Sequence, residues 1–418
     1  MSVIARTLGI SLAVLALAAC ETTAPVGPTD PMAGETANTG STTSAEPGDA
    51  DTGPTDLRPG QASASGPSLT LTPIIPMLSK PLPPETRLTR IAFGSCLKQE
   101  DDQSIWQTVE ASDPDLFLFI GDNVYGDIYS GDPAMPELRS AYNTLAKSTP
   151  FASLRANVPV MAVWDDHDYG LNDAGGTFAL KYGTEALFEE AWALPADDPR
   201  RARDGVYTSD IVGPSGERVQ IILLDTRFFR DDLLPTDQRN APGKERYLPD
   251  PDRSKTMLGE AQYAWLVKEL QKPADLRIIV SSIQVIAEGH GWEAWNTLPA
   301  ERQRLYDTIG ASGAEHVILL SGDRHAGGLY KTHRALPYPL YEITSSSLNA
   351  PASVWRAQSG ETRMEAGPNR LGPMMYEANF GLIDIDWSRR MVTLSLADAT
   401  GAPAQAIKVS FAELQISD

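Results

Sequence analysis

The sequence predicts an α/β fold in which a largely parallel or mixed β-sheet is covered by helices. Short apolar runs alternate with helical stretches along the chain, and successive strands joined by helices imply parallel neighbours. Polar or ionisable residues also follow several of the apolar runs directly, namely Cys96, Asp122, Asp166, Asp225 and Asp323. In folds of this class the ligand site lies at the carboxyl ends of the strands, so these side chains are expected to meet there.

The chain begins with a targeting segment over residues 1–20. Arg6 supplies a positive charge, and the apolar stretch 8–19 is too short to span a bilayer. It ends in Leu-Ala-Ala-Cys, which resembles the lipobox of bacterial lipoproteins and implies that Cys20 is lipidated. Glu21 follows instead of the aspartate associated with inner-membrane retention, so we expect the periplasmic side of the outer membrane. An ordinary cleaved signal peptide is the alternative.

Residues 21–85 are rich in Pro, Thr, Ser, Ala and Gly and show no apolar periodicity. This composition predicts a disordered tether, followed by one catalytic domain over residues 86–418. Of the two cysteines in the chain, lipidation of Cys20 would leave Cys96 without a disulfide partner in an exported protein, which requires an explanation.

Within residues 86–418 the elements follow in order from their apolar runs, helical periodicity and turn residues. Strands are predicted at 90–96, 115–120, 158–163, 219–224, 276–282, 316–320 and 340–344, with a hairpin of 381–386 and 391–397. Helices are predicted at 104–111, 136–147, 180–192, 256–271 and 300–309, with Thr256 as an N-cap. The segment 230–255, with many Pro, Asp and Arg residues, is expected to be a long surface loop.

The most informative stretch is Asp165-Asp166-His167-Asp168, at the end of the third strand. Two ionised carboxylates about 5 Å apart repel by roughly 3 kcal/mol at an effective dielectric near 20. Cations that neutralise them would stabilise the cluster, so the stretch favours a metal site with a histidine beside it. A solvated acidic turn is the simpler alternative for this motif alone.

The charge and the side-chain types favour a site for phosphate esters. With a formal net charge of −20, the chain is not expected to bind nucleic acid by phosphate neutralisation, and a site for phosphate would need cations. Two such ions about 3.5–4 Å apart serve phosphoryl transfer. Suitable ligands are Asp122, Asp166, Asp323 and His325, while a phenolate from Tyr125 would favour ferric iron and Cys96 could add a thiolate. Alternatively, Tyr125 and Cys96 are ordinary core residues and Asp225 caps a turn.

Five ordered motifs resemble those of the PhoD-like alkaline phosphatases, within the wider superfamily of calcineurin-like and purple acid phosphatases. They are FGSC at 93–96, GDNVYGD at 121–127, WDDHDYG at 164–170, LLDTR at 223–227 and SGDRH at 321–325. The resemblance implies mixed β-sheets in a sandwich flanked by helices, with the metal site at the carboxyl ends of the strands. It also implies two or more metal ions, iron with calcium or another divalent cation.

The resemblance implies roles for individual residues. Asp122 would bridge the metals, Tyr125 would bind iron, and Cys96, Asp166, Asp323 and His325 would complete the ligands. His167 takes the place of the catalytic histidine, and Asp168 that of the carboxylate that orients it. Asn172, Arg227 and Gln284 are expected to contact the substrate, whereas the roles of Asp127, His290 and Arg324 stay open.

The expected function is therefore a metal-dependent phosphoesterase acting on phosphomonoesters, phosphodiesters or both. The metals would generate a hydroxide nucleophile, and His167 would protonate the leaving oxygen. The sequence contains no Gly-x-Ser-x-Gly motif that would indicate a serine hydrolase. A lipoprotein that binds phosphate or phospholipid on the same fold without catalysis is the alternative.

Overall fold

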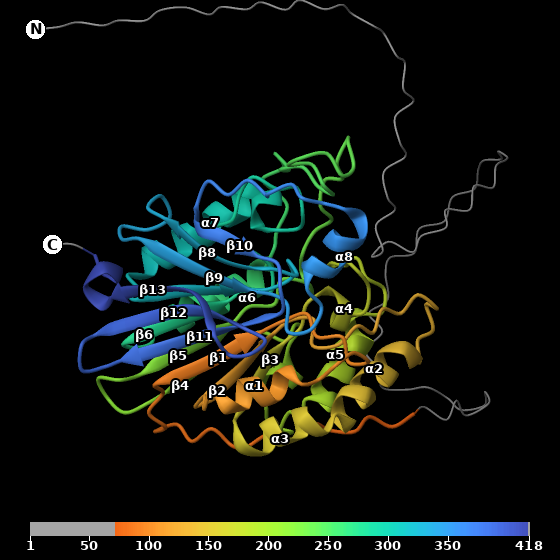
Figure 1. Cartoon of the computed structure of the whole chain (residues 1–418), viewed down its shortest axis with the longest axis horizontal. Helices are drawn as coiled ribbons and strands as arrows, with labels where there is room; N and C mark the ends of the chain where they lie inside the picture. Colours follow the sequence, from red (N-terminus) through yellow and green to blue (C-terminus); the bar gives the residue numbers. More distant parts are fainter. Residues whose placement is uncertain (1–71, 417–418) are drawn as a thin grey trace, which may run out of the picture. The chain divides into compact units, whose positions relative to one another are not determined.

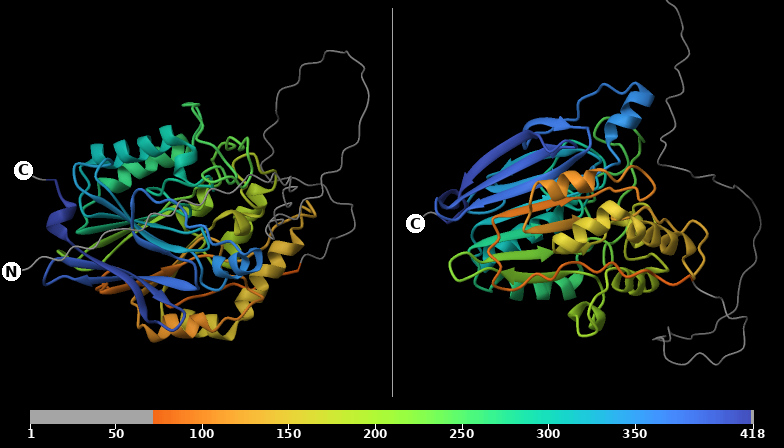
Figure 2. Two further views of the ribbon diagram at one scale, coloured as in Figure 1. Left: turned by 45° about the horizontal axis from the view of Figure 1, so that its top comes forward. Right: turned by 60° about the horizontal axis from the view of Figure 1, so that its bottom comes forward.

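The computed structural model describes residues 72–416 of the chain (Figure 1). The strands of this part form two mixed sheets, one of six and one of seven strands. Helices cover the outer faces of both sheets, so the predicted α/β class with mixed sheets flanked by helices is confirmed (Figure 2). No helix among the described residues is both long enough and apolar enough to cross a membrane.

The first sheet has the order β13-β12-β11-β1-β2-β3. Its parallel half follows from three apolar runs that form β1 (Arg90–Gly94), β2 (Leu116–Ile120) and β3 (Val160–Val163). The other half is antiparallel and comes from the C-terminal part of the described chain. It consists of β11 (Asn379–Asp386), which pairs with β1, β12 (Met391–Asp398) and β13 (Pro403–Ser410). The predicted hairpin of 381–386 and 391–397 is confirmed as β11 and β12.

The second sheet has the order β10-β8-β9-β7-β6-β5-β4. Its central strands are parallel and fully buried, namely β5 (Val219–Leu223), β6 (Leu276–Val280), β7 (Val317–Ser321) and β9 (Leu340–Ser345). Antiparallel strands complete both sides, as β4 (Thr208–Val212), β8 (Gly327–Thr332) and β10 (Arg370–Met375). These flanking strands were not predicted from the sequence because they lack a continuous apolar run.

Two apolar clusters hold the layers together. One contains residues of both sheets, such as Leu118 and Leu320, and also joins the helices beside β2, where Trp106 packs edge-on against Phe117 at 5.3 Å. The other fills the space between the second sheet and its helices, with Ile279 and Leu266 among its members. The described helices are α1 (Ile105–Ala111), α2 (Pro136–Lys147), α3 (Thr149–Asn157), α4 (Asp166–Tyr169), α5 (Lys181–Ala191), α6 (Gly259–Leu270), α7 (Pro299–Ser312) and α8 (Ala352–Ser359), with short 3₁₀ turns at Pro199–Ala202, Trp295–Thr297 and Phe411–Leu414.

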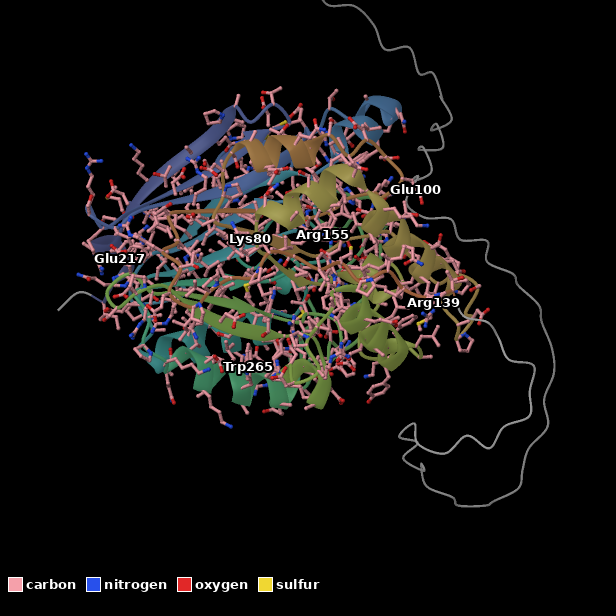
Figure 3. The ribbon with its side chains drawn as sticks, turned by 90° about the horizontal axis from the view of Figure 1, so that it is seen from below. Lys80, Glu100, Arg139, Arg155, Glu217 and Trp265 are labelled. Carbon is pink, nitrogen blue, oxygen red and sulfur yellow. The ribbon has the colours of Figure 1, made fainter. Side chains whose placement is uncertain are left out.

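The predicted tether needs one correction within the described residues. Residues 72–85 carry no helix or strand, but they pack on the body. The backbone N–H of Met77 donates to the carbonyl of Ala191, and that of Lys80 donates to the carbonyl of Arg155, both at 2.7 Å. Figure 3 shows Lys80 and Arg155 close together. Since the side chain of Met77 is also buried, the packed domain begins before residue 86.

Candidate metal centre

The turns after the central strands of both sheets meet at one end of the molecule, close to α4 and α8 (Figure 1). Gly322, after β7, lies so near Ser95, after β1, that a Cβ on Gly322 would stand 2.5 Å from Ser95 Oγ. Gly121, after β2, lies equally close to Asp165, after β3, at 2.6 Å from its Cβ. Only glycine permits such approaches. Gly322 therefore lets the turns of the two sheets come together, and Gly121 lets the turns after β2 and β3 of the first sheet do so.

A first group of candidate ligands consists of Cys96, Asp122, Tyr125 and His325. Asp122 Oδ2 lies 3.2 Å from Cys96 Sγ and 3.4 Å from the Tyr125 hydroxyl. The Tyr125 hydroxyl lies 3.2 Å from His325 Nε2. Ligand atoms of Cys96, Asp122 and His325 all lie within 4.8 Å of one another. The structure thus brings together Cys96, His325 and the motif that contains Asp122 and Tyr125, three segments that lie apart in the sequence.

The imidazole of His325 has the form that a metal ion requires. Its Nδ1 donates a hydrogen bond to the carbonyl oxygen of Ala350, which leaves the lone pair on Nε2 facing Tyr125. Burial lowers the pKa of His325 to about 4, so the ring is neutral near pH 7. The carbonyl group of Ala350 therefore selects the nitrogen that could bind a cation.

Four candidate ligands have left-handed backbone conformations. The φ angles are +56° at Cys96, +46° at Asp122, +68° at Asp323 and +51° at His325. Such conformations cost of order 1–3 kcal/mol for a residue with a Cβ and concentrate at functional sites. Here each one turns the chain sharply after a strand. The strained backbone therefore occurs at the residues whose side chains meet in the site.

A second group consists of Asp165, Asp166 and Asp323, whose carboxylate oxygens lie within 4.8 Å of one another. Asp166 also lies within this range of Asp122 and His167, so it connects the two groups. Asp165 was not among the predicted ligands. Its Oδ1 accepts hydrogen bonds from Arg227 Nε and from Ser282 Oγ, both at 2.6 Å.

Several carboxylate oxygens in these two groups lack a hydrogen-bond partner among the described residues. Asp122 Oδ1, Asp165 Oδ2 and Asp166 Oδ1 are buried and have no hydrogen-bond partner among the described residues. Burial and the neighbouring charges raise the pKa of Asp122 and of Asp323 well above the usual range. A buried polar group left unpaired costs about 1–3 kcal/mol, and bound cations would remove this cost.

The donor types fit more than one metal ion. The first group offers a thiol, a phenol, an imidazole and a carboxylate around one point, while the second group offers only carboxylates. Burial raises the pKa of the Cys96 thiol to about 11, so the thiolate would form there only with a cation to stabilise it. The predicted need for metal ions is therefore supported by the chemistry of the site.

His167 is oriented by Asp127, which corrects the predicted role of Asp168. Asp127 Oδ2 lies 2.7 Å from His167 Nδ1, and both side chains are more than nine-tenths buried. Asp168 instead accepts hydrogen bonds from the backbone N–H groups of Asp165, at 2.7 Å, and Asn123, at 3.2 Å. Asp168 therefore fixes the turns after β2 and β3, and the carboxylate partner of the histidine comes from the motif after β2.

The surroundings of His167 favour its protonated form. Burial lowers the pKa, but the carboxylates of Asp166 and Asp127 outweigh this effect and raise it to about 9. The ring also stacks on Tyr125, with 4.2 Å between ring centroids and 35° between planes. The predicted catalytic histidine thus lies directly beside the first group.

The three predicted substrate contacts have different surroundings. Arg227 is completely buried, and its Nη1 donates to Glu293 Oε2 at 2.6 Å while its Nε binds Asp165, so its charge is balanced inside the protein. Gln284 joins Tyr330, Thr344 and His290 through both ends of its amide, which leaves no atom of that amide directed at the carboxylates. Asn172 is partly exposed, and its contact with substrate stays a prediction.

Several residues at the site were missed or left open. Asp127 closes the predicted motif 121–127, but no sequence pattern indicated that His167 is its partner. Glu293 lies in a loop between Trp292 and Trp295, and no motif there indicated a site residue. Asp225 accepts from the N–H groups of Arg227 and Phe228, at 2.9 and 3.0 Å, so it caps a turn. Cys20, the predicted lipidation site, lies outside the described residues.

Comparisons with known proteins identify the family and the fold. The sequence model of the PhoD-like phosphatase family matches residues 91–396. Alkaline phosphatase D of Bacillus subtilis (strain 168) is 23% identical over an alignment of 280 residues, and the match covers 58% of this chain and 46% of that protein. The chain thus spans about half the length of this relative. The solved structure of PhoD shares the fold, with a TM-score of 0.56 and 16% identity over 79% of this chain and 70% of that chain.

Proposed function

This chain belongs to the family of PhoD-like phosphatases, and on that premise we propose that it is a metal-dependent phosphoesterase. Its substrates would be phosphomonoesters, phosphodiesters or both. The observation that carries the proposal is the convergence of thiol, phenol, imidazole and carboxylate groups around Asp122, with three buried carboxylate oxygens left unpartnered. Burying these carboxylates without cations would cost the folded state free energy, and bound cations would offset that cost.

The two groups of ligands suit different ions. Cys96 and Tyr125 favour iron in the first group, with Asp122 and His325 beside them. The carboxylates of Asp165, Asp166 and Asp323 favour calcium or another divalent cation that prefers oxygen ligands. When bound, the cations would lower the pKa of a water molecule and neutralise phosphate oxygens.

His167 would supply the proton that the leaving oxygen requires. Asp127 holds Nδ1 and stabilises the positive charge of the ring, which leaves the Nε2 proton for donation. Tyr125 fixes the plane of the ring by stacking on it. The leaving group would thus depart on the side of the site where the His167 ring lies.

The test combines metal analysis with a panel of mono- and diesters. We expect Asp122→Ala and His325→Ala to lose bound metal and hydrolysis together while keeping their circular dichroism. Asp307→Ala, on the exposed side of α7, is the matched control and should keep both. Metal content and rates that stay unchanged in the first two variants would overturn the proposal, and a wild-type protein that binds metal but hydrolyses no ester would favour a binding protein.

We also propose that the protein is anchored by lipid at Cys20 on the periplasmic side of the outer membrane. The support is the lipobox-like sequence that ends at Cys20. Two or more acyl chains give stable anchoring. Cys20→Ser should abolish lipidation, detected as a loss of acyl mass, and should release the protein from the outer-membrane fraction or leave its signal uncleaved. Unchanged fractionation and mass would contradict the anchor.

A further inference from the structure

The ammonium group of Lys98 lies beside the first group of ligands without an ionic partner. Lys98 is exposed, and its Nζ stands over the Tyr125 ring, 5.7 Å from the ring centroid. Apart from this contact, the ammonium makes no ion pair or hydrogen bond within residues 72–416. A cation that is held near a reaction centre but left unpaired is suited to bind an anionic part of a substrate.

The position of Lys98 is fixed by the segment that also orients His325. The side chain of Asn349 accepts from the backbone N–H of Lys98 at 2.7 Å and donates to its carbonyl at 2.9 Å. The next residue, Ala350, accepts the hydrogen bond from His325 Nδ1. Gln99, the residue after Lys98, accepts a hydrogen bond from the backbone N–H of Tyr125 at 2.9 Å and donates one to its carbonyl at 3.1 Å. The backbone at Lys98 is therefore tied to the centre on two sides.

Lys98 and His167 both lie beside the ring of Tyr125. His167, the proton donor, stacks on this ring, and the ammonium of Lys98 stands over it, 5.7 Å from the centroid. In a phosphomonoester every charge outside the phosphate belongs to the leaving group, so a second substrate charge that reaches Lys98 must lie on that group.

Other cations near the site are already neutralised. Arg227 binds Asp165 and Glu293, and Arg324 forms an ion pair with Glu365. The acidic residues that follow Lys98 do not pair with it in the described structure. Asp102 binds Ser104, and Glu100 is exposed, at the same end of the molecule as α8 (Figure 3). Lys98 therefore remains available to a substrate.

We propose that Lys98 selects phosphate esters whose leaving group carries a second negative charge, a carboxylate or a further phosphate. The inference rests on the proposed phosphoesterase function and names the class of substrate for that site. An ion pair at an exposed position contributes up to about 1 kcal/mol, so we expect a preference of about fivefold for such an ester over a neutral one of the same shape.

The test compares 3-carboxyphenyl phosphate with 3-carbamoylphenyl phosphate, which differ in charge but hardly in shape. The ratio of their kcat/KM values within one variant is independent of metal content and of the fraction of active protein. We expect a ratio of about 5 for the wild type and for Lys98→Arg, about 1 for Lys98→Ala, and below 1 for Lys98→Glu. Lys268→Ala, on the exposed side of α6, should keep the wild-type ratio.

Each other outcome counts against the proposal. A wild-type ratio near 1 would overturn it, and so would an equal loss of both rates in Lys98→Ala, which would mean that Lys98 acts through Tyr125. If the wild type hydrolyses neither ester, the proposed phosphoesterase function is wrong. The role of Lys98 is then tested by calorimetry, which measures the affinities of the corresponding non-hydrolysable phosphonates. Tighter binding of the carboxylate form that disappears in Lys98→Ala supports the proposal, and equal affinities overturn it.

Discussion

The imidazole of His167 is held by Asp127, whose Oδ2 lies 2.7 Å from Nδ1, and not by Asp168, its neighbour in the chain. The reason is local geometry. His167 and Asp168 both lie in the one-turn helix α4, where successive side chains point about 100° apart and do not face each other. The partner of the histidine must therefore come from another segment, and the turn after β2 supplies it.

The first prediction concerns this pair. Loss of a well-placed general acid costs on the order of 10²–10⁴-fold, but only when the leaving group needs a proton. We expect His167→Ala to reduce kcat for alkyl phosphate esters by such a factor and to affect nitrophenyl esters far less, because nitrophenolate leaves as an anion. Asp127→Asn should show the same selectivity with a smaller loss, roughly 10–100-fold. Equal losses for both ester classes, at equal metal content, would exclude the acid role.

The second prediction separates Asp168 from catalysis. Its carboxylate accepts backbone hydrogen bonds from Asp165 and Asn123 and a further one from the Asn123 amide. Asp168→Asn replaces one acceptor oxygen by a donor and leaves a buried group unpaired, so it should lower the free energy of unfolding by about 1–3 kcal/mol. Denaturant unfolding measures this loss. The ratio of alkyl to nitrophenyl rates should stay at the wild-type value, and a change in that ratio like that of Asp127→Asn would restore the original assignment.

The third prediction concerns the identity of the first metal. If ferric iron binds Cys96 and Tyr125, the purified protein should absorb visible light through charge transfer from thiolate and phenolate. We expect Tyr125→Phe to weaken the band and Cys96→Ala to shift it, with iron content measured on the same samples. An unchanged spectrum and iron content in Cys96→Ala would make Cys96 a packing residue.

The fourth prediction concerns the dependence of stability on pH. Burial, together with the charges of Asp225 and Asp204, raises the pKa of Glu185 from 4.5 to about 8. Between these pH values the unfolded chain binds fewer protons at this site than the folded chain does, so ionisation of Glu185 makes the folded state less stable as the pH rises toward 8. Glu185→Gln stays neutral and can still accept the hydrogen bond from the Gly205 N–H, at 2.5 Å in the wild type.

Thermal unfolding of both proteins from pH 5 to pH 9 tests this. The Tm of Glu185→Gln relative to that of the wild type should rise with pH across this range. A constant difference would mean that Glu185 is ionised in the folded protein throughout.

Much of the fold could be predicted because its parallel strands are short, continuous apolar runs. Such runs indicate buried strands wherever they occur, and β1, β2, β3, β5, β6, β7 and β9 were all predicted. The flanking strands β4, β8, β10 and β13 were not, because an antiparallel strand beside a formed sheet needs hydrogen bonds more than apolar side chains. In β13, for example, most residues are exposed or partly exposed.

The sequence alone indicates which residues follow the buried strands, and it therefore predicts that Cys96, Asp122 and Asp166 meet at one edge of the first sheet, because parallel strands end at a common edge. Asp323 follows β7 of the second sheet, so its approach to the other three depends on how the two sheets pack. The pairing of the side chains likewise depends on the tertiary structure. Asp127 forms a hydrogen bond with His167, and Arg227 donates hydrogen bonds to Asp165 and Glu293. In each case the partners come from different segments of the chain. A strand end is a local property of the chain, whereas a hydrogen bond between side chains depends on the directions that two segments acquire only when they pack together.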